Sequence, residues 1–157
     1  MYATFSFLYY MNQIEIFTDG ACRGNPGKGG WGALIRKGDK EDLIYGGELE
    51  TTNNIMELTA AVESLRTLKR SCNIIITTDS NYVKNGITEW IKNWKIKGWK
   101  TSNKKPVKNK ELWIQLDKEC SRHTITWKWV KGHSGHIENE IADQLANEAI
   151  DEHFINE

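Results

Sequence analysis

Residues 73–80 decide the fold, and their sequence is Asn73-Ile74-Ile75-Ile76-Thr77-Thr78-Asp79-Ser80. The unbroken run of β-branched residues predicts a strand buried on both faces, which is typical of the middle of a parallel sheet. Asp79 follows at the carboxyl end of this strand, where open α/β sheets bind their ligands. The same Asp-Ser pair could instead cap a helix that begins at Asn81, and both interpretations fit Asp79 equally well.

The segments on both sides of this strand complete an α/β domain. Polarity alternation and turn-length links predict three earlier strands, at residues 14–18, 31–36 and 43–49. Helical spacing of apolar residues predicts helices at 55–68, from 81 onward, at 112–120 and at 137–149. A second alternating run predicts a strand at 124–130. This order predicts an α/β fold whose mixed five-stranded sheet, an antiparallel meander plus parallel strands, is flanked by helices.

Length and composition fit one domain. The chain has 157 residues, of which 39% are hydrophobic and 27% charged, as in ordinary globular proteins. We expect the domain at residues 14–150, an N-terminal extension at 1–13 and a tail at 151–157. The aromatic first ten residues lack the features of a signal peptide, and Met11 is an alternative start.

Cysteine usage and hydropathy bear on the location of the protein. The three cysteines, Cys22, Cys72 and Cys120, are an odd number without metal-ligand spacing. They predict free thiols in a reducing cytoplasm. No apolar run approaches the length that spans a membrane, so we expect no membrane partner.

Charge is balanced in total but not along the chain. The 21 basic and 21 acidic side chains cancel, so bulk charge gives no sign of a nucleic-acid binder. Residues 92–110, however, contain eight lysines and no acid, interleaved with Trp94 and Trp99. A lysine run is ordinarily a solvated face. In a neutral chain, this complete absence of acids favours a patch that binds phosphates.

Four carboxylates lie at informative places, and each has a purely structural alternative. Asp19, at the end of the first predicted strand, precedes Gly20 and fits a turn. Glu57 has the spacing of a capping box with Asn54. Asp143 lies off the apolar stripe of the last helix, where solvated residues are usual. Only convergence of these residues with Asp79 would create a site for divalent cations.

Five short motifs occur in order along the chain. They are Ile16-Phe17-Thr18-Asp19-Gly20-Ala21-Cys22-Arg23-Gly24-Asn25-Pro26-Gly27, Thr51-Thr52-Asn53-Asn54-Ile55-Met56-Glu57-Leu58, Thr77-Thr78-Asp79-Ser80, Trp129-Val130-Lys131-Gly132-His133 and Asn139-Glu140-Ile141-Ala142-Asp143. Together they resemble bacterial type-1 ribonuclease H over about residues 14–149. Any one of these motifs would be a weak signal, whereas five in order make a strong one.

This resemblance implies a ribonuclease H-like fold and a metal-dependent endonuclease that cuts the RNA strand of RNA–DNA hybrids. Asp19, Glu57, Asp79 and Asp143 would hold two Mg²⁺ or Mn²⁺ ions, with Asp19 bridging both. The products would carry 5′-phosphate and 3′-hydroxyl ends. His133, in a glycine-flanked loop, would assist proton transfer or product departure, which its ordinary pKa near 6.5 permits.

The resemblance also implies residues that bind the hybrid. Polar groups that contact the RNA 2′-hydroxyls would be Cys22, Asn25, Thr52, Asn53, Asn54, Glu57 and Asn81. The segment at about 90–110 resembles the basic protrusion of bacterial members, which we call the handle. Its candidate substrate contacts are Trp90, Lys95, Lys97, Trp99, Lys100, Lys105 and Lys108. We favour packing over nucleic-acid contact for Trp90, Trp94 and Trp99.

Two positions depart from the family pattern. Asn81 stands where glutamine is found in the best-known bacterial members, and Ile96 stands where a basic residue is expected. The competing interpretations are another nuclease or a polymerase-associated domain of the same superfamily, a non-catalytic hybrid-binding module, and a structural protein with acidic surface decoration. We expect a monomer, because no self-complementary seam is readable.

Overall fold

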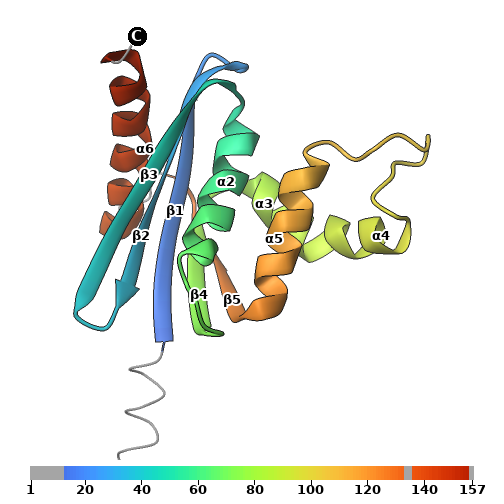
Figure 1. Cartoon of the computed structure of the whole chain (residues 1–157), viewed down its shortest axis with the longest axis horizontal. Helices are drawn as coiled ribbons and strands as arrows, with labels where there is room; N and C mark the ends of the chain where they lie inside the picture. Colours follow the sequence, from blue (N-terminus) through green and yellow to red (C-terminus); the bar gives the residue numbers. More distant parts are fainter. Residues whose placement is uncertain (1–12, 133–135, 156–157) are drawn as a thin grey trace, which may run out of the picture.

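The computed structural model describes residues 13–132 and 136–155, and it is built around one mixed sheet (Figure 1). The five strands are β1 (Gln13–Arg23), β2 (Gly27–Lys37), β3 (Lys40–Thr51), β4 (Asn73–Thr78) and β5 (Thr124–Trp129). Their order in the sheet is β3-β2-β1-β4-β5. The pairs β1–β2 and β2–β3 are antiparallel, while β4 runs parallel to both β1 and β5. The predicted five-stranded mixed sheet is confirmed.

Helices cover the two faces of this sheet unequally. The helical elements are α2 (Asn53–Arg66), α3 (Asn81–Asn85), the π-helical turn η1 (Gly86–Trp90), α4 (Ile91–Ile96), α5 (Lys110–Arg122) and α6 (Ile137–Ile155). In Figure 1, α6 lies on one side of the sheet, α2 and α5 lie on the other, and α4 projects beyond α5. Within residues 13–132 and 136–155, no helix is long and apolar enough to cross a membrane.

The main core lies between the sheet and helices α2 and α5. Ile16 and Ile76 of the two central strands are fully buried there, against Leu58 and Val62 of α2 and Trp113 of α5. The prediction that β4 is buried on both faces holds only in part, because Ile75 is half-buried. The reason is that α6 packs on β1, β2 and β3 and leaves this half of the other face less covered.

Helix α6 approaches the sheet closely because small residues meet there. A Cβ atom added to Gly32 would lie 2.5 Å from the carbonyl oxygen of Ala142. Gly32 pairs with Asp19 across the β1–β2 ladder. The close approach therefore brings the turn of α6 that carries Asp143 towards Asp19.

The elements extend further than the sequence pattern predicts. Strand β1 continues to Arg23, so Asp19 lies inside the strand and the prediction that it ends the strand is wrong. Gly20 and Ala21 keep pairing with β2, and the chain turns only at Gly24, whose φ is +84°. Helix α2 likewise begins at Asn53, earlier than the predicted start at residue 55, so Glu57 lies in its second turn and not in its first.

Candidate active site

Three carboxylates meet at one place on the sheet. Asp19 comes from the middle of β1, Glu57 from α2, and Asp79 follows the last residue of β4. Each offers an oxygen, and these oxygens lie within 4.8 Å of one another. Glu57 is 5% exposed, whereas Asp19 and Asp79 are partly buried. Residues distant in sequence thus form one compact negative cluster.

A glycine makes this proximity possible. A Cβ atom on Gly20 would lie 2.6 Å from the backbone nitrogen of Glu57 and 2.8 Å from the carbonyl carbon of Met56. Strand β1 and helix α2 therefore touch through their backbones beside Asp19. In the sequence, Asp19 followed by Gly20 fits a turn. The adjacent Asp-Gly pair was the available signal, but the contact it permits was not predictable from it.

The structural alternatives for two carboxylates are not realised. Ser80, not Asp79, caps α3, and its hydroxyl accepts a hydrogen bond from the backbone N–H of Val83 at 3.1 Å. Thr52 caps α2 by accepting from the N–H of Ile55 at 3.2 Å. Glu57 is therefore not needed for the cap and points into the cluster.

Burial and mutual repulsion disfavour negative charge in this cluster. Burial, followed by repulsion from Asp79 and more weakly from Asp143, raises the pKa of Asp19 to about 7. Burial also raises the pKa of Glu57 well above its ordinary value, and the charges of Asp19 and Asp79 add to the rise. The free protein thus holds carboxyl groups that would ionise more readily beside a positive charge.

Asp143 lies beside this trio. Its charge raises the pKa of Asp19, and its own carboxylate accepts from the Asn147 amide at 3.4 Å. Asp143 is half-buried, so the alternative of a fully solvated position does not hold. The four predicted carboxylates thus occupy one region, with three in tight contact and the fourth acting from α6.

The donor set fits divalent cations. Carboxylate oxygens are the ligands that Mg²⁺ and Mn²⁺ prefer. One buried oxygen of Glu57, Oε2, has no hydrogen-bond partner among residues 13–132 and 136–155, and an unsatisfied buried acceptor is costly. A cation would satisfy that oxygen and offset the repulsion that raises the two pKa values. Asp19, Glu57 and Asp79 are therefore suited to hold metal, with Asp143 at the edge of the site.

His133 lies outside the described residues, but its neighbour is placed. A Cβ atom on Gly132 would lie 2.8 Å from the Oδ2 atom of Asp79. Gly132 therefore lies directly beside the carboxylate cluster.

All the predicted 2′-hydroxyl contacts except Asn81 belong to two segments that are joined by a hydrogen bond. The side-chain oxygen of Asn25 accepts from the backbone N–H of Asn53 at 3.0 Å. The Cys22 thiol donates to the carbonyl of Gly24 at 2.7 Å. Asn53 and Asn54 are exposed at the start of α2, and Asn81 is exposed at the start of α3. The turn after β1 and the start of α2 therefore form one polar platform above Glu57.

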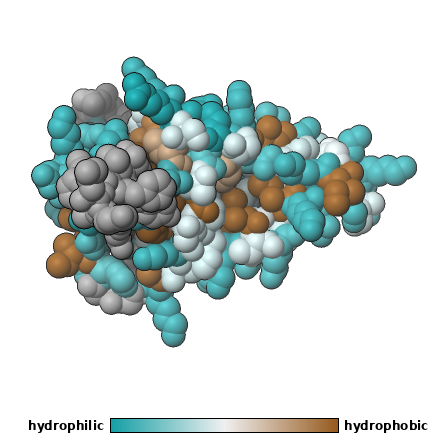
Figure 2. Space-filling model, turned by 90° about the horizontal axis from the view of Figure 1, so that it is seen from below, coloured by the Kyte–Doolittle hydropathy of each residue, from teal (hydrophilic) through white to brown (hydrophobic). Residues whose placement is uncertain are grey.

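The handle is a separate projection with its own packing. Ring centroids of Trp90 and Trp94 are 5.7 Å apart, and those of Trp94 and Trp99 are 6.1 Å apart. This packing agrees with the structural role favoured for these tryptophans. All eight lysines except Lys110 are exposed, and Lys95 pairs with Asp117 at 3.2 Å. Figure 2 shows hydrophilic and apolar residues interleaved at this narrow end of the molecule.

The handle also makes the distribution of charge along the chain uneven. Eight of the 21 basic side chains lie in residues 92–110, so the rest of the chain has 13 basic and 21 acidic side chains. The neutral total thus conceals a positive projection on a negative body.

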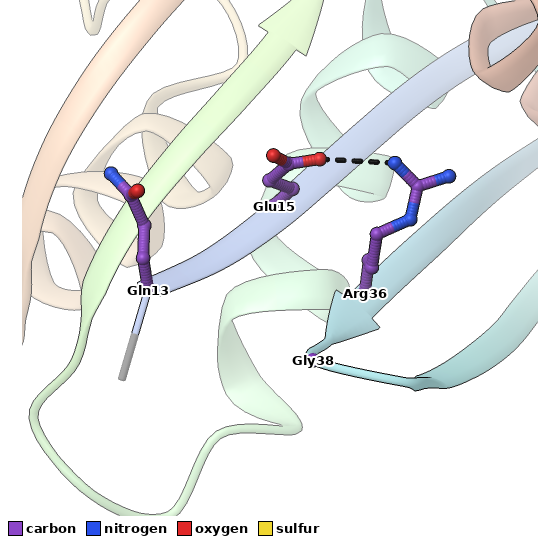
Figure 3. A pocket seen from close by; sticks show the side chains of 4 residues that line it. All are labelled: Gln13, Glu15, Arg36 and Gly38. Atoms are coloured by element: carbon purple, nitrogen blue, oxygen red, sulfur yellow. Dashed lines mark hydrogen bonds and ion pairs between the residues drawn. The ribbon is translucent and has the colours of Figure 1, made fainter. Parts of the chain in front are cut away.

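A hollow of about 190 Å³ lies elsewhere, at the start of β1, lined by Gln13, Glu15, Arg36 and Gly38 (Figure 3). Arg36 donates there to Glu15 at 3.1 Å and also contacts Glu41 and Glu138. The arginine is thus already matched by carboxylates, and we assign this hollow no part in the candidate site.

Known proteins resemble this chain along nearly its whole length. A family model described as RNase H matches residues 11–151. The ribonuclease H of Hydrogenovibrio crunogenus is 63% identical over 142 residues, which cover 90% of this chain and 98% of that protein. A ribonuclease H of Coxiella burnetii is 61% identical over 141 residues, which cover 90% and 92% respectively.

A solved structure agrees with the sequence relatives. The crystal structure of LC9-RNase H1, described as a type 1 RNase H with the type 2 active-site motif, superposes with a TM-score of 0.82 at 29% identity. The match covers 90% of this chain and 74% of that one. Sheet order, carboxylate cluster, family model and bacterial relatives all agree, and the chain belongs to the RNase H family.

Proposed function

We propose that this protein is an endonuclease that hydrolyses the RNA strand of RNA–DNA hybrids with two bound divalent cations, and that it leaves 5′-phosphate and 3′-hydroxyl ends. The observation that carries the proposal is the compact trio of Asp19, Glu57 and Asp79 in a chain of the RNase H family. Mg²⁺ is the proposed ion, and Mn²⁺ has the same ligand preference.

The proposed metal ligands are Asp19, Glu57, Asp79 and Asp143. Bound divalent cations lower the pKa of a coordinated water and offset the charge on the attacking and leaving oxygens. Asp19 interacts with both Glu57 and the α6 residue Asp143, so it is the carboxylate proposed to contact both ions. The protein supplies fixed carboxylates, and the core behind them limits how far they move.

His133 is proposed to hold or move a proton near the departing group. The preceding residue, Gly132, lies against Asp79, and this contact supports a role for the next residue at the cluster. A histidine with an ordinary pKa exchanges protons near neutral pH. Its loss should slow the reaction without abolishing it.

The polar platform is proposed to recognise the RNA strand. The 2′-hydroxyl is the group that distinguishes RNA from DNA. The residues proposed to contact the RNA strand are Cys22, Asn25, Thr52, Asn53, Asn54 and, at the start of α3, Asn81. The oxygen of Asn25 already accepts from Asn53, so its amide N–H groups are the part left to donate outward.

The handle is proposed to bind phosphates of the DNA strand. Lys97, Lys100, Lys105 and Lys108 are exposed, whereas Lys95 shares its charge with Asp117. Affinity should therefore fall as salt rises. Trp90 and Trp99 are proposed to support this surface more through packing than through contact. We further propose a cytoplasmic monomer.

One assay tests this function. Purified protein is incubated with a hybrid labelled on its RNA strand, with RNA–RNA, DNA–DNA and single-stranded RNA as controls, with and without Mg²⁺. An Asp19→Asn variant runs alongside, because it keeps the side-chain shape and removes one charge. Metal-dependent cutting of the hybrid's RNA alone, lost in the variant, is the expected result, and end analysis should find 5′-phosphates.

Other outcomes would contradict the proposal in different ways. Equal cutting by the variant would mean contamination or a wrong site. Binding of the hybrid without cutting would indicate a non-catalytic module. Cutting of duplex DNA would instead indicate another nuclease of the superfamily.

A further inference from the structure

The two ends of the handle meet at one atom, the phenol oxygen of Tyr82. The indole N–H of Trp113 donates to this oxygen at 3.0 Å. The side-chain amide of Asn109 also donates to it, at 3.0 Å. Tyr82 lies in α3, where the chain enters the handle. Asn109 and Trp113 lie where the chain returns into α5. The hydroxyl therefore ties the entry of the projection to its exit.

The side chain of Asn109 bonds to Tyr82 and does not cap helix α5. It occupies the N-cap position of α5, where asparagine commonly bonds the first turn, yet its side chain makes no capping hydrogen bond. Its backbone is left-handed, with φ of +59°. Glycine adopts this conformation most readily, and asparagine is one of the few other residues that tolerate it. The side chain that would cap the helix turns to Tyr82 instead.

Aromatic packing extends from this oxygen into the handle. The ring of Tyr82 lies 5.2 Å from that of Trp113 and 5.7 Å from that of Trp90. Trp90 contacts Trp94, and Trp94 contacts Trp99. Gly86 leaves room for Trp113, because a Cβ atom there would overlap the indole ring. A displacement at Tyr82 would thus pass along a continuous row of rings to the lysines.

We propose that the Tyr82 hydroxyl is a positioning residue that fixes the direction of the handle and thereby sets the affinity for the hybrid. It acts through Asn109 and Trp113. The proposal rests on the proposed function, because the handle must bind a phosphate backbone for its direction to matter. The hydroxyl is the specific element, since the ring alone would supply only packing.

The test compares two tyrosines that differ in location. Tyr82→Phe keeps the ring and removes the acceptor, which leaves the N–H of the fully buried Trp113 unpaired. Tyr45→Phe is the matched control. Its hydroxyl donates to Glu152 at 2.9 Å, on the α6 side of the sheet. Each variant loses one hydroxyl group. Tyr82→Phe removes two accepted hydrogen bonds at the handle, whereas Tyr45→Phe removes one donated hydrogen bond far from it.

The first measurement uses the free protein. Amide hydrogen exchange of residues 91–109 should quicken by about tenfold in Tyr82→Phe, and it should be unchanged in Tyr45→Phe. Equal exchange in the wild type and in Tyr82→Phe would refute the tie, whatever a hybrid assay gives.

The second measurement uses the hybrid. With Mg²⁺ present, Tyr82→Phe should raise the KM for the hybrid by about threefold to tenfold, because part of the free energy of the two lost hydrogen bonds is felt at the handle, while kcat changes less than twofold. A fall in kcat at constant KM would overturn the proposal. Absence of hybrid binding and cutting by the wild type would refute the proposed function itself, which distinguishes the two failures.

A double variant separates the tie from an independent action of Asn109. Asn109→Gly tolerates positive φ and removes the donor, so it should relieve backbone strain and still weaken binding. If both residues act through one bond, Tyr82→Phe combined with Asn109→Gly should weaken binding little more than Tyr82→Phe alone. Fully additive losses would overturn the tie.

Discussion

The carboxylate cluster and the handle are both dense in one sign of charge, but they are built in opposite ways. The cluster gathers Asp19, Glu57 and Asp79 from three elements into partial or full burial, with oxygens within 4.8 Å. The handle carries eight lysines on one continuous segment, and nearly all are exposed. Crowded charges need a rigid scaffold to hold them, whereas exposed charges are screened by water and salt.

The two regions therefore depend on different properties. At the cluster, position is decisive, because the protein must hold like charges together against their repulsion. At the handle, the number of charges and their common direction are decisive. A small steric change should therefore damage the first region, while charge removal should damage the second gradually.

The largest effect should come from Gly20→Ala. The added methyl group must push apart β1 and α2, since it would lie 2.6 Å from the nitrogen of Glu57. Displacement of reacting groups by about 1 Å can cost about 100-fold in rate. Steady-state cleavage of a hybrid should show a loss of that order in kcat.

Gly38→Ala is the control for this variant. Gly38 has φ of +60° and open space around it, so alanine there costs backbone strain but lies at the far end of the β2–β3 hairpin. It should lose stability and keep its kcat. Equal loss of kcat in both variants would mean that stability, not the position of Glu57, explains the effect.

Charge removal at the handle should have a smaller and salt-dependent effect. Replacing Lys97 and Lys100 by glutamine should weaken hybrid binding about tenfold at low salt and leave kcat at saturating hybrid nearly unchanged. The slope of log affinity against log salt should become shallower by up to about 1.8. Binding titrations at several salt concentrations measure both quantities.

Lys40 and Lys69, also exposed, provide the matched control. Their joint replacement by glutamine removes the same charge from outside the handle. If this control weakens binding as much as the handle variant does, net charge and not the handle determines affinity.

When metal is absent, the carboxylate cluster should also lower the stability of the folded protein. Asp19→Asn removes repulsion, so in chelator-treated buffer its melting temperature should exceed that of the wild type by about 2–6 °C. The folded pKa of Asp19 is about 7 against 3.8 ordinarily. Between these values the folded state binds more protons than the unfolded state, so wild-type stability falls as pH rises.

The advantage of Asp19→Asn should therefore grow from about pH 4 to about pH 7 and stay level above that. Added Mg²⁺ should stabilise the wild type more than the variant. A variant that is less stable than the wild type throughout this range would show that the cluster is not under electrostatic strain.

The smallest effect should come from His123. Its contribution to stability changes with pH in the direction opposite to that of Asp19. Its Nδ1 atom accepts from the backbone N–H of Cys72 at 3.1 Å. Burial and the neighbouring Arg122 lower the pKa of His123 below 6.5, so the unfolded state binds more protons. Stability contributed by the neutral ring is present above pH 6.5 and is lost as pH falls through the folded pKa.

His123→Asn keeps an acceptor without the titration and should remove this acid loss, whereas His123→Phe should cost about 1 kcal/mol near neutral pH. Urea unfolding at several pH values distinguishes the two. If His123→Asn still loses the same stability at acidic pH, another group is responsible for that loss.

The sequence predicted the sheet and the four carboxylates for different reasons. The β-branched run of β4 and the order of elements follow from local periodicity, and these predictions were confirmed. For Asp79 the sequence alone left a cap and a site equally plausible, because both need a polar residue after a strand. The resemblance to a family favoured the site, and the cap was found at Ser80.

What could not be predicted depends on contacts between distant segments. The position of Asp19 inside β1 follows from pairing with β2 beyond Gly20, which a turn-forming glycine obscures. The tie at Tyr82 joins residues 27 and 31 positions apart, and neither tyrosine nor asparagine signals its partner in sequence. The acidity of Glu57 likewise depends on neighbours that only folding supplies.

The separation of charge along the molecule has a practical consequence. Helix α6, which contains six acidic residues up to Glu152, and the handle lie towards opposite ends of the longest axis (Figure 1). A protein with zero net charge is expected to pass through ion-exchange resins at pH 7. This one should instead be retained by a cation exchanger through one end and by an anion exchanger through the other, with its orientation on the resin reversed between them.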